Sequence, residues 1–141
     1  MNSGDVLRHE HFYRDEASGQ LKRKYLVLLA PTASENWVAG VLTSQANMRH
    51  EVPPCSHRPP YPGFFLGIPG EPLILKTWVD LGWLAEVDPF DVSRLTRAGV
   101  IARVLELPKA MLTSLLGCAA AADDTTVAQE RAIRDQLSRM R

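Results

Sequence analysis

Two histidine-containing pairs are the residues whose types and spacing could most directly do chemistry. His9 and His11 lie two residues apart on one face of an expected strand, where two imidazoles could hold a metal ion. No third ligand is obvious nearby, so we interpret them as exposed strand residues and expect no metal and no other cofactor. Cys55 and His57 could form a thiolate–imidazole pair, but the surrounding sequence offers nothing else that supports catalysis. Glycine-rich phosphate loops and the common zinc and hydrolase motifs are absent.

Two further groups are polar side chains placed next to apolar runs. The cluster Lys22-Arg23-Lys24 directly precedes the apolar run Tyr25–Leu29. The group Thr43-Ser44-Gln45 ends the apolar run that begins at Trp37. The basic cluster is either a solvated start of a strand or a contact for a phosphate group. The group Thr43-Ser44-Gln45 is either an ordinary polar strand end or part of the same phosphate-binding site.

The elements that would position these side chains are short strands followed by helices. Strands are predicted at 6–13, 25–29, 37–43, 64–68, 73–79 and 100–107. Asp88-Pro89 favours a helix start, and Pro108 and Thr126 open two more helices. Because the strands come first and the helices cluster late, we predict a mainly β protein, a small curled sheet or barrel with helices packed on its ends.

A proline-rich stretch interrupts the expected strands. Residues 53–72 contain seven of the ten prolines, and proline lacks the N–H that a regular strand ladder needs. We therefore predict a long loop here. It is either an exposed rigid insertion or a segment that contacts a partner.

Length and composition limit the remaining possibilities. The chain has 141 residues, 45% of them hydrophobic, with 16 Lys and Arg against 16 Asp and Glu. It suits one soluble domain, and no apolar run approaches the ~20 residues that cross a bilayer, so we expect no membrane contact. Zero net charge argues against a passive polyanion binder. Cys55 and Cys118 alone make neither a disulfide framework nor a zinc cluster, so we expect a reduced, cytoplasmic protein.

The order of the motifs resembles the MazF/PemK family of toxins, in the CcdB/Kid superfamily. Gly4-Asp5 opens the first strand, Arg23 stands at the head of an apolar strand, and Thr43 and Gln45 close the third, as in that family. The family has proline after this arginine, whereas Lys24 stands here. The likeness covers residues 4–116 and implies an SH3-like barrel of five to six strands. We expect the barrel and its closing helix over 1–117, and a linker and amphipathic helix over 118–141.

The resemblance also implies a reaction. The family's enzymes cleave single-stranded RNA at selected sequences without a metal, leaving a 2′,3′-cyclic phosphate and a 5′-hydroxyl. The implied roles of Arg23 and Thr43 are to neutralise and hold the phosphoryl oxygens during attack by the ribose 2′-hydroxyl. His11 is the best nearby candidate for proton exchange near neutral pH. The expected RNA contacts are Lys22, Lys24, Ser44, Gln45, Lys76 and Thr77.

Two functions of different classes follow from these observations. The first is a toxin endoribonuclease that works as a homodimer and is held inactive by an antitoxin protein. The alternative is a non-catalytic binding module on the same barrel, a gyrase-poison-like protein or a degenerate toxin, that acts through a protein partner. The ordered placement of Arg23 and Thr43 favours the enzyme. The neutral charge, the residue Lys24 and the proline-rich loop favour the binding module.

Overall fold

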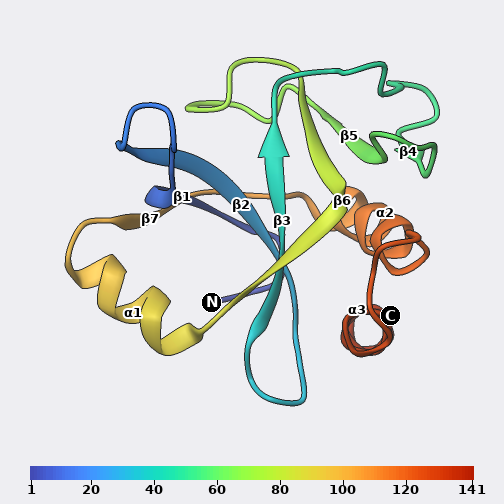
Figure 1. Ribbon diagram of the computed structural model, residues 1–141. Coiled ribbons are helices and arrows are strands. Elements are labelled where there is room, and N and C mark those ends of the chain that lie inside the picture. The colour runs from blue at the N-terminus through green and yellow to red at the C-terminus, as the bar shows by residue number, and fades with distance from the viewer.

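The computed structural model describes residues 1–141 and contains one antiparallel sheet with three helices (Figure 1). The seven strands follow the order β4-β5-β6-β3-β2-β1-β7. Their bounds are β1 (Asp5–Arg14), β2 (Leu21–Pro31), β3 (Trp37–Thr43), β4 (Cys55–Ser56), β5 (Gly63–Gly67), β6 (Thr77–Val87) and β7 (Ile101–Glu106). The helices are α1 (Pro89–Arg97), α2 (Lys109–Ala120) and α3 (Val127–Arg139). The prediction of a mainly β protein with late helices is confirmed.

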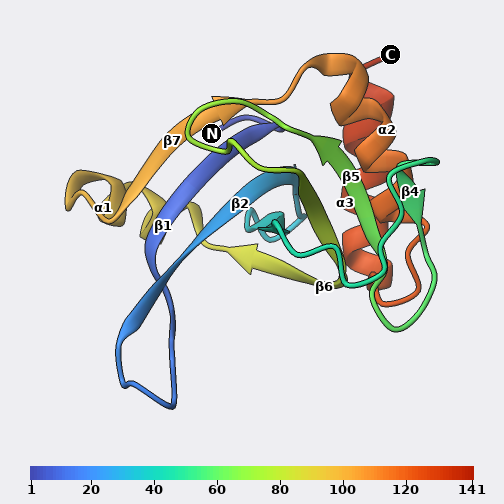
Figure 2. The same ribbon diagram turned by 90° about the horizontal axis from the view of Figure 1, so that it is seen from above.

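The sheet is curled but is not closed into a barrel (Figure 2). Strands β4 and β7 are its two edges and do not pair with each other. The physical reason lies in the proline-rich stretch, where β4 has only two residues and cannot extend its ladder. This short strand also makes the count seven, where five to six strands were expected.

The bounds predicted for the strand at 73–79 are wrong. Strand β6 begins at Thr77 and continues to Val87, and the residues before it form a loop. In this loop Ile74 and Leu75 expose about 60% and 61% of their surface, so their apolar character does not reflect a buried strand.

The two faces of the sheet carry separate hydrophobic cores. Along β2, Val27 and Leu29 belong to the larger core, which includes Leu116 of α2 and Ile133 of α3. The alternate residues Leu26 and Leu28 belong to a smaller core that includes Val92 of α1. The continuous apolar run at 25–29 therefore marks a strand buried on both faces, as its pattern predicts.

The helix starts follow their predicted signals. The Asp88 side chain accepts a hydrogen bond from the Phe90 N–H at 2.7 Å and caps α1. Thr126 and Gln129 form a reciprocal capping box at the start of α3. Helix α3 packs against α2 and β2, and α2 itself continues to Ala120, past residue 117. No helix in the structure is long and apolar enough to span a membrane.

The two cysteines form a disulfide between β4 and α2. The expectation of reduced, unpaired cysteines is wrong in this structure. The sequence gives no sign of the pairing because the two residues are 63 positions apart and meet only when α2 packs beside the edge of the sheet. Disulfides are typical of oxidising compartments, so this bond weakly argues against a cytoplasmic location, which stays a prediction.

Candidate functional site

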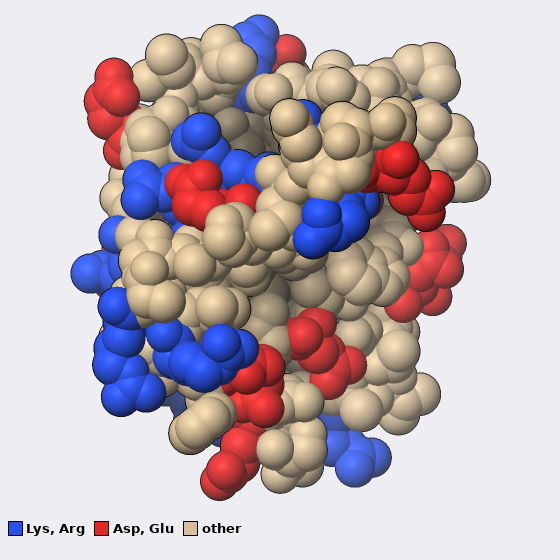
Figure 3. Space-filling view, turned by 60° about the vertical axis from the view of Figure 1, so that its left-hand side comes forward, with Lys and Arg blue, Asp and Glu red and all other residues tan.

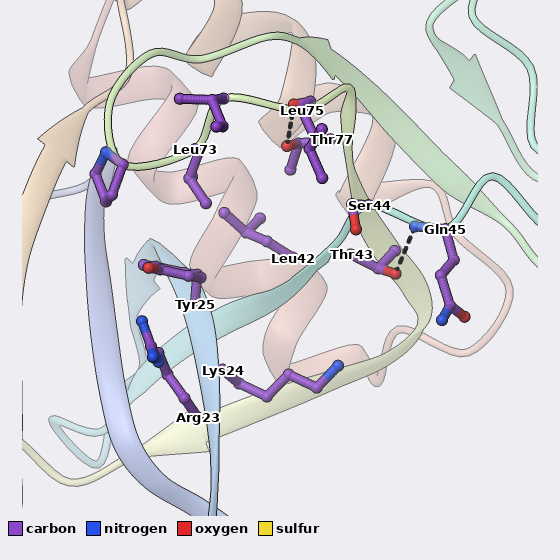
Figure 4. Close-up of a pocket in the computed structure, with 12 residues that line it drawn as sticks. Arg23, Lys24, Tyr25, Leu42, Thr43, Ser44, Gln45, Leu73, Leu75 and Thr77 are labelled. Atoms are coloured by element: carbon purple, nitrogen blue, oxygen red, sulfur yellow. Dashed lines mark hydrogen bonds between the residues drawn. The ribbon is translucent and has the colours of Figure 1, made fainter.

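An open pocket of about 370 Å³ lies where β2 begins, β3 ends and β6 begins (Figure 4). Its lining residues come from three segments that are distant in the sequence. They are Arg23, Lys24 and Tyr25; Leu42, Thr43, Ser44 and Gln45; and Pro72, Leu73, Ile74, Leu75 and Thr77. Six of the residues that the sequence assigned to a site therefore share one pocket.

The strand register explains this convergence. Strands β2 and β3 pair antiparallel with Leu26 opposite Val41, so the start of β2 lies beside the end of β3. Strand β6 pairs with the other side of β3 and places Trp78 opposite Thr43. The pocket is thus positioned by the backbone ladders of three central strands.

The cationic side of the pocket is formed by Arg23 and Lys24. The Nε atom of Arg23 lies 3.4 Å from Oε2 of Glu10 on β1, and 54% of the arginine side chain is exposed. Tyr25 first, and then the Glu10 carboxylate, raise the pKa of Arg23 above its usual range, so the guanidinium stays charged. No acidic residue is among those that line the pocket. The arrangement therefore favours an anionic ligand.

The hydroxyl side of the pocket contains two threonines with different roles. The Thr43 hydroxyl accepts a hydrogen bond from the Gln45 N–H at 3.1 Å, so its own proton can still be donated to a ligand. The Thr77 hydroxyl is buried and donates to the Leu75 carbonyl at 2.9 Å. Figure 4 shows both bonds on the side of the pocket away from Arg23. Thr43 is therefore the hydroxyl that can contact an anion, whereas Thr77 fixes the loop before β6.

Glu10 is a functional candidate that the sequence did not single out. Its Oε1 atom lies 2.9 Å from Nε of Arg8, and its other oxygen faces Arg23. The Arg8 Nε atom has no aligned hydrogen-bond partner despite this short distance, so the contact is an ion pair only. The carboxylate consequently stands between two guanidinium groups, one of which, Arg23, lines the pocket. Only the pairing of β1 with β2 brings it there.

Arg49 is a second residue that sequence reasoning missed. Only 4% of its side chain is exposed, and its Nη2 atom lies 3.6 Å from Oδ1 of Asp80. Its Nη1 atom donates to the Gln45 carbonyl at 3.0 Å. A single arginine in a loop carries no sequence signal of burial. In the structure it holds the turn that carries Gln45 against the sheet.

Three of the expected site residues lie outside the pocket. Lys22 and Lys76 do not line it, and Nζ of Lys76 is 3.0 Å from Oε2 of Glu51. His11 donates its backbone N–H to Nδ1 of His9 at 3.1 Å, and neither histidine lines the pocket.

His9 lines a different cavity of about 180 Å³, together with Leu26 and the α1 residue Asp91. Burial, and secondly the nearby His11, lower the pKa of His9 below its usual range. The other residues that line this cavity include Leu26 and Val92 of the smaller core, so His9 lies on the α1 side of the sheet.

The surface charge is uneven although the net charge is zero. On the face that Figure 3 shows, many Lys and Arg side chains gather toward the left, with acidic side chains between them. A local basic region of this kind is compatible with an anionic ligand that a uniformly neutral surface would not attract.

Comparisons of this chain with protein-family models, with curated proteins and with solved structures find no match.

Proposed function

We propose that this protein is a metal-independent endoribonuclease of the MazF/PemK type that cleaves single-stranded RNA. The observation that carries the proposal is the convergence of Arg23 and Thr43 in one pocket with no lining carboxylate. The two residues are 20 positions apart in the sequence, and the pairing of β2 with β3 brings them to one pocket. On this proposal, strands β6, β3, β2, β1 and β7 correspond to an incompletely closed SH3-like barrel, and β4 and β5 are an extension of it.

The pocket supplies the interactions that this reaction needs. The Arg23 guanidinium can hold two phosphoryl oxygens through its planar fork, and the Lys24 ammonium adds charge. The Thr43 hydroxyl lies on the side of the pocket away from the Arg23 guanidinium (Figure 4) and can donate to another part of the bound RNA, because it uses only its acceptor capacity on the Gln45 N–H. The two cationic groups stabilise the additional negative charge that develops on the phosphoryl oxygens during attack.

Glu10 takes the role of general base that the sequence assigned to His11. Its carboxylate adjoins Arg23, whereas His11 lies beside His9 and lines no part of the pocket. Glu10 would accept the proton of the ribose 2′-hydroxyl, and the 2′-oxygen would attack the adjacent phosphorus. The bond to the 5′-oxygen then breaks, and that oxygen takes a proton from water. The products are the 2′,3′-cyclic phosphate and the 5′-hydroxyl.

The ion pair between Glu10 and Arg23 is compatible with these roles. Both side chains are substantially exposed, and exposed ion pairs contribute little because water competes for both charges. An RNA phosphate can therefore replace the carboxylate at Arg23 and leave Glu10 beside the bound ribose.

The same proposal includes a homodimer and an inhibitory antitoxin protein. One surface feature supports the antitoxin. The loop before β6 exposes Ile74 and Leu75 at the rim of the pocket. Two large apolar side chains next to a basic pocket suit a partner that combines apolar and acidic groups, as an inhibitory peptide would.

The test is an end-group analysis of RNA cleaved by the disulfide-bonded protein in EDTA. An unstructured RNA should yield discrete fragments with 2′,3′-cyclic phosphate and 5′-hydroxyl ends. The same RNA with 2′-deoxyribose at the cleaved positions should remain intact there, because the attacking hydroxyl is missing. Cleavage that requires added metal, or that continues at the deoxy positions, would contradict the proposal.

A second candidate function is a binding module without catalysis. It is favoured by the absence of any histidine or carboxylate among the residues that line the pocket. Fluorescence anisotropy with RNA, together with the cleavage assay, separates the two candidates. Binding that depends on Arg23 without any cleavage would select the binding module.

A further inference from the structure

A second cluster of reactive side chains lies outside the pocket, where β4 meets α2. The Nε2 atom of His57 lies 3.4 Å from Sγ of Cys55 and 3.5 Å from Sγ of Cys118. The ligand atoms of these three residues all lie within 4.8 Å of one another. None of the three lines the Arg23–Thr43 pocket, so the cluster is a separate site.

We propose that this cluster binds a zinc ion when the disulfide is reduced, with Cys55, His57 and Cys118 as its three protein ligands. Thiolate sulfur and imidazole nitrogen are the ligands that zinc prefers in proteins. A pair of cysteines that forms a disulfide under oxidising conditions is, in a reducing compartment, more often a metal-binding or catalytic pair. The inference does not depend on the proposed function.

The position of the histidine fits tetrahedral coordination. Zn–S bonds of about 2.3 Å and Zn–N bonds of about 2.0–2.1 Å, at a tetrahedral angle, place sulfur and nitrogen ligands about 3.6 Å apart. The two observed distances from Nε2 of His57 to sulfur are close to this value. Only the two sulfurs have to separate, to about 3.8 Å, once their bond is broken.

The environment of the cluster allows a metal ion to enter. Cys55 and His57 are half-buried, while Cys118 is buried in the larger core. Nε2 of His57 is 2.9 Å from the Cys118 carbonyl oxygen, a contact that Nε2 makes as a donor. Zinc binding requires the other tautomer, with the proton on Nδ1, so this hydrogen bond is exchanged for the metal bond. A water molecule would complete the coordination on the exposed side.

The redox step is balanced by a dithiol reductant. The reductant transfers two electrons and two protons to the Cys55–Cys118 bond, giving two protein thiols and the disulfide of the reductant. Zinc then binds the two thiolates and releases both protons. The consequence is that β4 remains attached to α2 under both conditions, through a covalent bond when oxidised and through the metal when reduced.

The experiment is a titration with Co²⁺, whose thiolate complexes absorb visibly, followed by displacement with Zn²⁺. The protein is reduced with a dithiol, which is then removed without oxygen. Reduced wild-type protein should bind one Co²⁺ with thiolate-to-metal charge-transfer absorption, and Zn²⁺ should abolish that absorption. The oxidised protein should give no such signal. His57→Ala should bind at least tenfold more weakly, whereas the control His50→Ala should match the wild type.

A thermal unfolding measurement on the wild-type protein alone tests the proposal even if a variant fails to fold. Zinc should raise the unfolding temperature of the reduced wild-type protein and leave that of the oxidised protein unchanged. The proposal is overturned if zinc leaves the reduced protein unchanged, or if reduced His57→Ala binds cobalt as tightly as the wild type.

Discussion

The Arg23–Thr43 pocket and the Cys55–His57–Cys118 cluster are built in opposite ways. The pocket lies on the central strands, where the β2–β3 and β3–β6 ladders fix its side chains without any cross-link. The cluster lies at the β4 edge, where a two-residue strand in a proline-rich stretch is attached to α2 by a disulfide. Backbone register is therefore sufficient to place side chains in the middle of this sheet, whereas a disulfide holds its irregular edge against α2.

Glu10→Gln gives the largest expected effect on the pocket. Cleavage of RNA should fall at least about a hundredfold, because the amide cannot accept the 2′-hydroxyl proton. Binding of a 2′-deoxy analogue should not weaken, because the change removes a negative charge beside Arg23. Glu16→Gln, in the exposed turn between β1 and β2, is the matched control. Equal cleavage rates in the two variants would remove Glu10 from the mechanism.

Removal of the disulfide should affect the cluster and leave the pocket intact. In Cys55→Ser/Cys118→Ser, the free energy of unfolding should fall by about 2–4 kcal/mol, since the unfolded chain regains the freedom of a long loop. Denaturant titration measures this loss. The folded variant should cleave RNA at the wild-type rate, and a parallel loss of cleavage would show that the two regions are not independent.

Arg49→Met tests whether the turn that carries Gln45 positions the pocket. The methionine side chain fills similar space but cannot donate a hydrogen bond to the Gln45 carbonyl. The turn beside Thr43 should therefore loosen. We expect a stability loss of about 1–3 kcal/mol and roughly tenfold slower cleavage, because one buried acceptor loses its partner. The comparison variant is Arg58→Met, at an exposed position in the proline-rich stretch. Wild-type cleavage by a destabilised Arg49→Met would show that the turn does not position the site.

The smallest expected effect concerns the α1 side of the sheet. Because the pKa of His9 is lowered in the folded protein, the unfolded chain takes up the proton first as the pH falls. The contribution of His9 to stability is therefore present above its ordinary pKa of about 6.5 and is lost as the pH falls below it. His9→Gln should flatten the stability profile between about pH 7 and pH 5. His50→Gln, at an exposed position, should keep the wild-type slope, and identical profiles in both variants would contradict this interpretation.

The sequence predicted the parts of the molecule that local rules control. The apolar run at 25–29, the Asp88 cap and the capping box at Thr126 gave a strand and two helix starts because each depends on neighbouring residues. The resemblance to the toxin family, rather than a local rule, indicated Arg23 and Thr43, and both line the same pocket.

The remaining features depend on distant contacts and had no local signal. Glu10 reaches Arg23 only through the pairing of β1 with β2, and Cys118 reaches Cys55 only through the packing of α2. The loop containing Ile74 and Leu75 is apolar but exposed, so its composition indicated a strand that does not exist there.

The measurement that tests the central claim most directly compares RNA cleavage by Arg23→Ala and Arg97→Ala in EDTA. Both substitutions remove an exposed arginine, but Arg97 lies on α1, away from the pocket. Arg23→Ala should remain folded by circular dichroism and cleave at least about a hundredfold more slowly than the wild type. Arg97→Ala should cleave at the wild-type rate. Equal cleavage by both variants would contradict the assignment of the pocket as the RNA-cleaving site.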